Sequence, residues 1–407
     1  MQILVVSQYY PPESGATQNR LGSFVEGLVG RGHAVTVICE QPNHPSGIFH
    51  PGFGRRPLIT ETDDDLTVHR LWVAASPHKT TTRRLAFYGT FAAGAGALVA
   101  TGPRYDVAFA SSPPLPGAFA AGFAAHARGI PVVVDVRDLW PAVAEALGEL
   151  SASPVMRMFE WAERSLYGFA SRITATTRPF CRHIDRVAGR PISVHLPNGA
   201  RDELLELPEP AQSQNGKPFT IGYAGNLGLA QGLEIIFDAA ECLRDDNIRF
   251  LLVGDGPLAQ ELRERRERRS LDAIELRPPV PVEDVGDILM ECDALLVPLR
   301  RHPLLADFIP SKLYDSMAVG RPVILAATGE AASLVEEAKC GVVVEPENGA
   351  ALADAARSLA RDPDSARALG QAGRREATVH VRSRQVERLE QVLLEVAAGA
   401  PYPVARL

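Results

Sequence analysis

Residues 309–324 read IPSKLYDSMAVGRPVI, and this stretch predicts a loop, a short helix and a buried strand, in that order. A proline and a serine stand where the helix would begin, and a glycine and a proline where it would end. The run Val323–Leu325 is apolar, as in a buried strand. Lys312 lies in the first helical turn, where backbone N–H groups without a helical partner favour an anion. The stretch therefore predicts either a phosphate-binding helix start or an ordinary capped helix on the surface.

The composition is that of a globular chain without a nucleic-acid or membrane-spanning signature. Its 407 residues suggest two domains. The formal net charge of -7 gives no basic footprint for nucleic acid. The five cysteines are scattered, without metal-ligand spacing or a disulfide framework, so we expect a reduced, cytoplasmic chain and no metal. We also expect no signal peptide and no membrane span, because no basic start and no long uncharged apolar run occurs.

The first half of the chain predicts a parallel α/β domain. A strand over Gln2–Val6, a helix over 18–29 and a strand over 34–39 form a βαβ unit. The loop before the helix contains Gly15 and Ala16, which are either simple turn residues or a close backbone approach to a ligand. The loop lacks the GxGxxG pattern, so a dinucleotide fingerprint is not supported.

Two other segments of this half are candidates for a functional role. A buried strand over 130–135 ends just before Arg137 and Asp138. Ligands of open parallel sheets bind beyond the carboxyl ends of strands, so these two residues are expected in a site; a local ion pair is the alternative. Residues 41–65 are rich in Pro, Gly, Asn and His and predict a long irregular loop, which is often functional.

Residues 79–100 combine a basic start with an uncharged apolar continuation. Lys79, Arg83 and Arg84 are followed by Leu, Phe, Ala and Gly up to Ala100. A helix that is apolar all round is either a buried core helix or lies in a membrane interface, here with its basic residues facing anionic headgroups. The sequence favours neither interpretation over the other.

The second half repeats the same strand, glycine loop and helix pattern after a linker-like stretch at 207–218, rich in Pro, Gln, Ser, Asn and Gly. Two doubly wound, Rossmann-like domains facing across a cleft are therefore expected. The predicted divisions are an N-terminal domain, a linker, a C-terminal domain and a C-terminal helix, over residues 1–198, 199–218, 219–380 and 381–407.

Five motifs in this order resemble the retaining glycosyltransferases of family GT4. They are PP at 11–12 with Gly15, VRDLWP at 136–141, YAGNLG at 223–228, GDGP at 254–257 and PSKLYD with GRPV at 310–323. Each motif alone is weak, whereas the ordered set covers nearly the whole chain. More narrowly, the chain is similar to the WbuB-like branch, the L-fucosamine and N-acetyl-L-fucosamine transferases of surface-polysaccharide assembly. The resemblance implies the GT-B fold, an N-terminal acceptor domain, a C-terminal nucleotide-sugar domain and a C-terminal helix that packs back on the first domain.

The resemblance also implies a metal-independent enzyme. It would move a sugar, an N-acetylated deoxyhexosamine, from a nucleotide-sugar donor, with UDP favoured, to a lipid-linked saccharide or another O-antigen or capsule precursor. Residues 79–100 would then contact the cytoplasmic face of the inner membrane peripherally, and no nucleic acid would be bound. The alternatives are a non-hydrolysing UDP-sugar 2-epimerase and a non-catalytic sugar-nucleotide-binding subunit of polysaccharide assembly.

The family pattern assigns site residues with some departures. Catalytic roles fall on Lys312, Arg137, Asp138 and Asp307. The donor-binding set is Gly15, Ala16, Gly225, Asn226, Gln231, Gly254, Val280, Pro310, Ser311, Lys312, Leu313 and Asp315.

Five of these positions depart from the pattern that is common in the family. Asp307 and Asp315 stand at the spacing of a common glutamate pair, with Asp315 at the ribose-binding position. Asn226 and Gln231 replace an Arg and a Lys that hold the diphosphate, so Lys312 would become the principal cation. Arg137 stands where a His is frequent.

Overall fold

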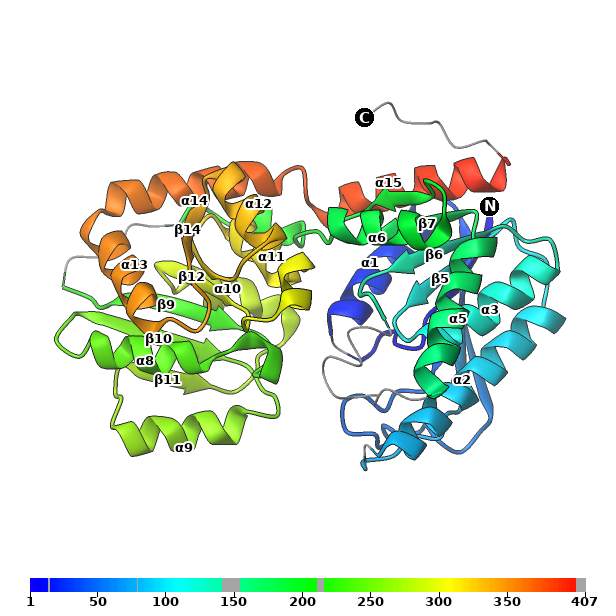
Figure 1. The fold of residues 1–407 in the computed structure, drawn as a ribbon, viewed down its shortest axis with the longest axis horizontal. Helices are drawn as coiled ribbons and strands as arrows, with labels where there is room; N and C mark the ends of the chain where they lie inside the picture. The colour runs from blue at the N-terminus through cyan, green and yellow to red at the C-terminus, as the bar shows by residue number, and fades with distance from the viewer. Residues whose placement is uncertain (14, 79, 141–153, 211–215, 400–407) are drawn as a thin grey trace. The chain divides into compact units, whose positions relative to one another are not determined.

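The computed structural model describes residues 1–13, 15–78, 80–140, 154–210 and 216–399. It divides into two compact units (Figure 1). Unit 1 comprises Met1–Pro197 and Ser383–Leu407, and unit 2 comprises Asn198–Arg382. Each unit is an α/β domain built on a predominantly parallel sheet, as the repeated strand and helix pattern predicts.

In the described part of unit 1, eight strands form one sheet in the order β3-β4-β2-β1-β5-β6-β7-β8. The neighbours pair in parallel except for β3 and β4. The strands are β1 Gln2–Val6, β2 Ala34–Glu40, β3 Leu58–Asp63, β4 Leu66–Leu71, β5 Val107–Ser112, β6 Val132–Val136, β7 Arg172–Ala175 and β8 Ser193–His195. The helices are α1 Ala16–Gly30, α2 Thr81–Thr101, α3 Leu115–Ala127, α5 Pro154–Phe169, α6 Arg178–Ala188 and α15 Arg382–Ala397.

The edge strand β3 corrects the expectation of an irregular segment over 41–65. Residues 58–63 pair antiparallel with β4 through a turn at Asp64, which has φ of 42°. Most of this strand is exposed and polar, with the sequence LITETD. Because both faces of an edge strand can meet solvent, its sequence lacks the apolar run or alternation by which strands are recognised.

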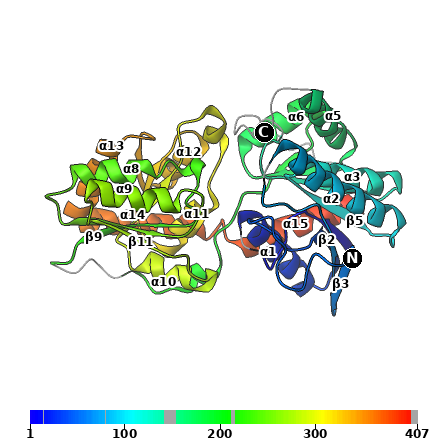
Figure 2. The ribbon, with the colours of Figure 1, turned by 90° about the horizontal axis from the view of Figure 1, so that it is seen from below.

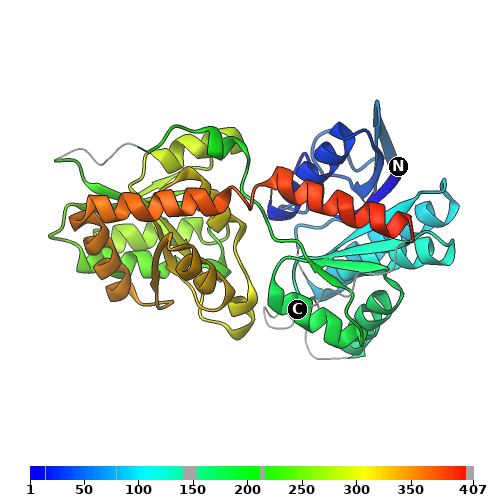
Figure 3. The same ribbon diagram turned by 90° about the horizontal axis from the view of Figure 1, so that it is seen from above.

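Two helices of unit 1 bear on the sequence predictions. Helix α2 buries Phe91, Ala95 and Val99 completely and packs on α3, while its exposed positions carry mainly Thr, Ala and Gly. Helix α15 lies beside α1 (Figure 3). Its apolar face enters the same core as α1, and the side chain of Val386 fills the space beside Gly27. The C-terminal helix thus packs on unit 1, although the chain reaches it from unit 2.

In the described part of unit 2, six parallel strands follow the order β11-β10-β9-β12-β13-β14. They are β9 Phe219–Ala224, β10 Ile248–Val253, β11 Ile274–Arg277, β12 Ala294–Pro298, β13 Val323–Ala326 and β14 Gly341–Val344. The α-helices are α7 Glu203–Glu206, α8 Glu234–Cys242, α9 Ala259–Arg269, α10 Val285–Met290, α11 Ser311–Val319, α12 Glu330–Ala338, α13 Gly349–Arg361 and α14 Pro363–Ala377. Short 3-10 helices are η1 Leu229–Gln231, η2 Val282–Asp284 and η3 Pro303–Asp307.

Helices cover both faces of this sheet (Figure 2). Helices α8 and α13 contribute to one apolar core, and α10, α11 and α12 to the core on the other face. Such a sheet is buried on both sides, which explains the continuous apolar runs of its strands. Its carboxyl edge is left to the connecting loops, where a ligand can bind.

The stretch expected as a linker over 199–218 belongs to unit 2 where the structure describes it. Ala200 forms a parallel bridge with Val381, and Leu204 on α7 is buried in the unit 2 core. The compositional signal therefore marks an irregular connection, while its first residues are anchored by backbone pairing and an apolar side chain.

Candidate functional site

Glycines line the carboxyl edge of the unit 2 sheet. Gly225 follows β9 with φ of +139°, and Gly254 follows β10 with φ of +152°. A Cβ on Gly254 would lie 1.9 Å from the carbonyl oxygen of Gly225, so the two loops touch and exclude a side chain there. A Cβ on Gly225 would lie 3.1 Å from the Nζ atom of Lys312. Bare backbone of the loop after β9 thus lies against the lysine of α11.

Lys312 is held over Tyr223 of β9. Its Nζ donates a hydrogen bond of 2.6 Å to the Tyr223 hydroxyl and lies 3.9 Å from the ring centroid. The hydroxyl in turn donates to the carbonyl oxygen of Asn226 at 2.6 Å. Burial lowers the pKa of Lys312 to about 7, and no carboxylate among the described residues forms an ion pair with it. The ammonium is therefore partly desolvated without a counter-charge, an environment that favours an incoming anion.

The start of α11 supplies further donors. Pro310 is its N-cap, and no side chain caps the first turn. The Leu313 N–H of the first turn donates to the Pro310 carbonyl at 2.9 Å, whereas those of Ser311 and Lys312 have no partner within the helix. A helix N-terminus also attracts negative charge. At its other end the helix stops at Gly320, which has φ of +81°. The end of the helix at Gly320 and the strand β13 that follows confirm the predicted order of loop, helix and strand over residues 309–324.

Asp315 lies one turn into α11 and contacts the chain entering unit 2. Its Oδ1 accepts from the Arg201 backbone N–H at 3.0 Å, and its Oδ2 lies 3.7 Å from the Arg201 Nε. Burial raises the pKa of Asp315, while the positive charges of Arg201 and Arg382 oppose that rise. Arg382 also donates its backbone N–H to the carbonyl of Ala200. The carboxylate therefore joins the two segments at which the chain enters and leaves unit 2.

Two uncharged amides flank Gly228 in the loop after β9. A Cβ on Gly228 would lie 2.6 Å from the Asn226 Nδ2 and 2.7 Å from the Gln231 Oε1. The Gln231 oxygen is buried and accepts no hydrogen bond from the described residues. Unsatisfied buried acceptors are uncommon, so this oxygen is available to a ligand donor.

Three other charged residues of unit 2 lie between β12 and α11. Arg300 pairs with Glu234 at 2.8 Å, and Arg301 pairs with Glu345. Asp307 ends η3 and is half-buried, and its carboxylate makes no hydrogen bond or ion pair with a described residue. The two arginines are thus engaged by carboxylates, which leaves Lys312 as the better placed cation.

In unit 1, Arg137 holds the loop beyond β6. Its guanidinium donates to the hydroxyls of Ser111 and Thr17 and to the carbonyl of Pro113. Burial lowers the pKa of Arg137, opposed by the charge of Asp138. Burial also raises the pKa of Asp138, opposed by the charge of Arg137. The expected proximity of these two residues to the carboxyl end of β6 is confirmed, but the arginine bonds to the β5 loop and to α1.

Gly15 and Ala16 stand at the start of α1, as expected. Gly15 is the N-cap in an extended conformation, and a Cβ there would lie 2.5 Å from the Oε1 of the buried Gln18. One turn further, Arg20 forms a buried ion pair with Asp135 at 3.0 Å and donates to the carbonyls of Leu196 and Pro197. This pair ties α1 to β6 and to the last residues of the first chain segment of unit 1.

A buried polar network beyond β1 and β2 escaped the sequence analysis. Glu40 accepts from the Gln8 and Asn43 side-chain amides, both at 2.8 Å, and Glu13 accepts from the backbone N–H groups of Asn43 and His44, both at 2.6 Å. The Glu13 Oε2 and the Gln8 Oε1 are buried without a partner among the described residues. Burial raises the pKa of Glu40 well above its usual range. A buried glutamate at the end of a largely apolar strand was the available signal.

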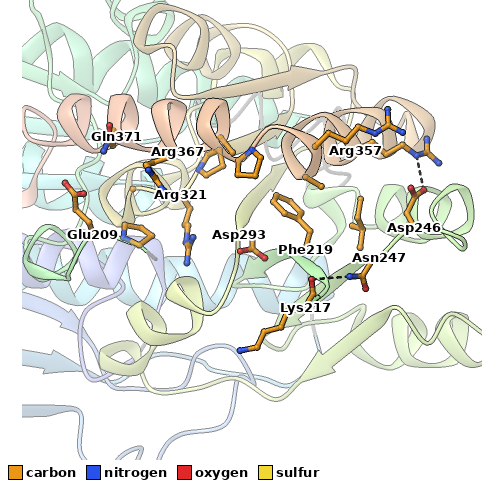
Figure 4. A pocket seen from close by; sticks show the side chains of 18 of the residues that line it. Glu209, Lys217, Phe219, Asp246, Asn247, Asp293, Arg321, Arg357, Arg367 and Gln371 are labelled. Atoms are coloured by element: carbon orange, nitrogen blue, oxygen red, sulfur yellow. Dashed lines mark hydrogen bonds and ion pairs between the residues drawn. The ribbon is translucent and has the colours of Figure 1, made fainter. Parts of the chain in front are cut away.

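Each unit contains a cavity. One of about 180 Å³ in unit 1 is lined by Tyr9, Asn43, His44 and Arg83, among others. The other, of about 620 Å³, lies at the amino end of the unit 2 strands, where Phe219 and Asp293 line it (Figure 4). It is therefore at the opposite end of the sheet from Lys312.

Among the described residues no group of three or more His, Cys, Asp or Glu side chains is placed to hold a metal, and no helix is long and apolar enough to cross a membrane.

Comparisons with known proteins identify the family of the chain. Residues 15–199 match the family "Glycosyl transferase 4-like domain", and residues 208–376 match "Glycosyl transferases group 1". The Escherichia coli (strain K12) protein named as the colanic acid biosynthesis glycosyl transferase WcaI is 27% identical over 376 residues, covering 86% of this chain and 90% of its own.

A second relative is the GDP-mannose-dependent alpha-(1-6)-phosphatidylinositol monomannoside mannosyltransferase of Mycobacterium tuberculosis (strain CDC 1551 / Oshkosh). It is 25% identical, with 94% of each chain covered. The crystal structure of Anabaena HepE in complex with UDP superposes with a TM-score of 0.69 and 16% identity, over 97% of this chain and 100% of that one. This likeness confirms the GT-B fold.

The relatives do not single out the WbuB-like branch, so that narrower assignment stays a prediction. Nearly the whole chain is nevertheless covered by the two family matches taken together, and the fold agrees with them. The chain belongs to the group 1, GT4-like glycosyltransferases with the GT-B fold, and it is an enzyme of nucleotide-sugar-dependent glycosyl transfer.

Proposed function

We propose that this glycosyltransferase transfers an N-acetylated deoxyhexosamine from a UDP-sugar to a lipid-linked saccharide or a related polysaccharide precursor. The observation that carries the donor assignment is Lys312. Its ammonium stands at the uncapped start of α11, beside bare glycine backbone and without a carboxylate partner among the described residues. A diphosphate is the anion that such a combination of a lysine and free amide groups binds.

Lys312 would act on the leaving group. As the bond between the anomeric carbon and the phosphate oxygen breaks, negative charge grows on the diphosphate. A preorganised cation and helix N–H groups stabilise this charge by several kcal/mol, about 2.7–4 kcal/mol for a single donor in comparable oxyanion sites. In same-face transfer the acceptor oxygen bonds to the anomeric carbon, and its proton passes to the departing phosphate oxygen.

Other residues of unit 2 would orient the donor. The expected set around the diphosphate and sugar is Gly225, Gly254, Ser311 and Leu313, which lie on the glycine loops and in the first turn of α11. Asn226 and Gln231 would contact the sugar or the diphosphate through neutral amides, and the unpartnered Gln231 oxygen supports a contact with a hydroxyl or an amide N–H of the sugar.

Three further residues belong to the proposed donor site. Asp315 would accept the ribose hydroxyls, although Arg201 already occupies one of its oxygens. Val280 would contact the base through its backbone. The Asp307 carboxylate, which makes no hydrogen bond or ion pair with a described residue, would assist near the reacting sugar.

Unit 1 would provide the acceptor side. Arg137 and Asp138 lie at the carboxyl end of β6, and Gly15 and Ala16 at the start of α1. Because Arg137 is engaged by Thr17, Ser111 and Pro113, it would position these loops, and the half-buried Asp138 would be the group that meets the substrate. The cytoplasmic location and the independence from metal belong to the same proposal; unchanged activity in EDTA tests the latter.

A thermal-shift panel of UDP-, GDP- and ADP-sugars tests the donor assignment, since a ligand that binds the folded state raises the melting temperature. UDP is favoured by the resemblance and by the HepE complex with UDP, whereas the mycobacterial relative is named for GDP-mannose. We expect the largest rise with a UDP-sugar and its loss in Lys312→Ala. No rise with any sugar nucleotide would refute the proposal.

The proposed transfer is tested against the two alternatives of the sequence analysis, an epimerase and a non-catalytic sugar-nucleotide-binding subunit. The second alternative was prompted by the neutral amides of Asn226 and Gln231, which stand where the family resemblance implies cations. Incubation of the best donor with and without acceptor distinguishes the possibilities. Transfer to a lipid-linked acceptor supports the enzyme, binding without turnover supports the subunit, and conversion of the donor alone would indicate an epimerase.

A further inference from the structure

Helices α3 and α5 of unit 1, which lie side by side, carry an unusual apolar surface (Figures 1 and 2). Phe123 is 55% exposed, Met158 is 52% exposed and Trp161 is 60% exposed. We call these three residues, together with Phe119 and Phe169, the aromatic patch. Scattered single apolar residues are ordinary on protein surfaces, but connected ones indicate an interaction site.

The aromatic rings of the patch are in mutual contact. The Phe119 centroid lies 6.2 Å from that of Phe123 and 5.5 Å from that of Trp161, and Phe123 lies 6.2 Å from Phe169. His126 stacks on Phe169 at 5.1 Å. The patch is therefore one continuous surface assembled from two helices, and little side-chain freedom would be lost when it meets a partner.

The charges around the patch are mostly positive, although the chain as a whole carries a net charge of -7. Arg157 and Arg164 are exposed and lie one turn to either side of Trp161 on α5. Arg190 bonds to the carbonyls at the end of α5, next to Phe169. Glu160 is an acidic residue exposed on the same helix. Aromatic side chains bordered by arginines suit the interface of an anionic bilayer, where amphipathic rings sit at the headgroup level.

Helix α2, the segment that the sequence offered for membrane contact, is less suited to it. Its Phe91 is buried, its other large apolar side chains are only partly exposed, and its exposed positions after Arg83 are four alanines, one glycine and one threonine. Such a face removes little apolar area from water on insertion. The aromatic patch, on α3 and α5, instead offers large side chains that are more than half exposed.

We propose that the aromatic patch binds the surface of a bilayer that contains anionic lipids. Phe123, Met158 and Trp161 enter the interfacial region, and Arg157 and Arg164 face the phosphate groups. The protein would thereby meet a lipid-linked acceptor in two dimensions. The binding itself requires no donor and no turnover, so it can succeed or fail independently of the proposed glycosyl transfer.

Flotation of the full-length protein with vesicles tests this proposal. Vesicles of phosphatidylcholine with one quarter phosphatidylglycerol should carry the protein, and pure phosphatidylcholine should carry much less. The double variant Phe123→Ala/Trp161→Ala should lower the partition coefficient about tenfold or more, given the free energy of burying such side chains. Trp72→Ala is the matched control, because Trp72 is 42% exposed but lies outside the patch.

Two further readouts keep the test independent of folding. All variants should show the wild-type melting temperature within a few degrees, since the altered side chains are exposed. In a Trp72→Phe background the fluorescence should shift to shorter wavelength on adding anionic vesicles, because Trp140 is buried and Trp161 reports the patch. Unchanged flotation of the double variant, or an equal loss in Trp72→Ala, would overturn the proposal. Concentration-dependent dimerisation abolished by the double variant, without lipid binding, would instead assign the patch to a protein interface.

Discussion

The protonation state of Lys312 should control the affinity for the donor. Burial lowers the pKa of this lysine to about 7, from the ordinary 10.5. At about 1.36 kcal/mol for each pKa unit, the charged form is disfavoured by roughly 5 kcal/mol in the unliganded protein. A bound diphosphate restores a counter-charge, so it should raise the lysine pKa and take up a proton on binding above pH 7.

The size of the effect follows from the fraction of lysine that is protonated. With a pKa of about 7 in the free protein, roughly nine tenths of the ammonium is present at pH 6 and about 3% at pH 8.5. If only the charged form binds strongly, the dissociation constant of the donor should rise about thirtyfold between these pH values. An intact nucleotide-sugar is the appropriate ligand, because its diphosphate diester has no group that titrates in this range.

Calorimetric titration of the donor at pH 6, 7, 8 and 8.5 measures this dependence. Repeating it at pH 8 in two buffers of different ionisation enthalpy reports the proton taken up. Lys312→Arg is the control, since a guanidinium stays charged throughout and its profile should vary less than about threefold. A flat wild-type profile, or the same decline in Lys312→Arg, would refute the reasoning.

Three other perturbations test the structural account. Lys312→Met should raise the melting temperature of the unliganded protein most at pH 6 and less at pH 9. Because the unfolded lysine keeps its proton to about pH 10.5, the stability of the wild type rises above pH 7 and approaches that of the variant. An equal effect at both pH values would contradict this. Arg20→Leu should destabilise the fold by about 3–5 kcal/mol in urea unfolding, because Asp135 is left buried without its partner, and Asp135→Leu added to it should recover part of the loss. Gly254→Ala should cost more than about 3 kcal/mol, because its Cβ meets the Gly225 carbonyl, whereas Gly30→Ala, with open space around it, should be nearly neutral; equal effects would show that the glycine loops can separate.

Much of the architecture could be predicted because parallel strands buried on both faces are continuous apolar runs. The stretch 309–324 shows this well. Its apolar run specifies β13, its lysine lies in the first turn of α11, and its glycine marks the end of that helix. Helix α15 was expected on the first domain only through the resemblance. The position opposite Gly27, where Val386 packs, cannot be read from a pattern of hydrophobicity.

The site was less accessible to prediction, because partners distant in the chain decide what a polar residue does. Arg137 lies in a sequence motif, but its side chain bonds to Thr17, which is 120 residues earlier. Asp315 suits a ribose, yet Arg201 reaches it from the stretch expected as a linker. The Glu13 and Glu40 network is likewise assembled by two loops and the last residue of β2, each ordinary in sequence. Only the three-dimensional arrangement shows which of these carboxylates still has an oxygen without a partner.

The central claim is that Lys312 stabilises the leaving diphosphate during sugar transfer. Turnover of wild type and Lys312→Ala should be compared with the donor selected by the thermal-shift panel and a membrane lipid extract as acceptor, following radiolabelled sugar into lipid. The account predicts a fall in kcat of about 100-fold to 1,000-fold, as for the loss of one oxyanion donor, with the fold intact. Full turnover with unchanged donor affinity in Lys312→Ala would contradict it.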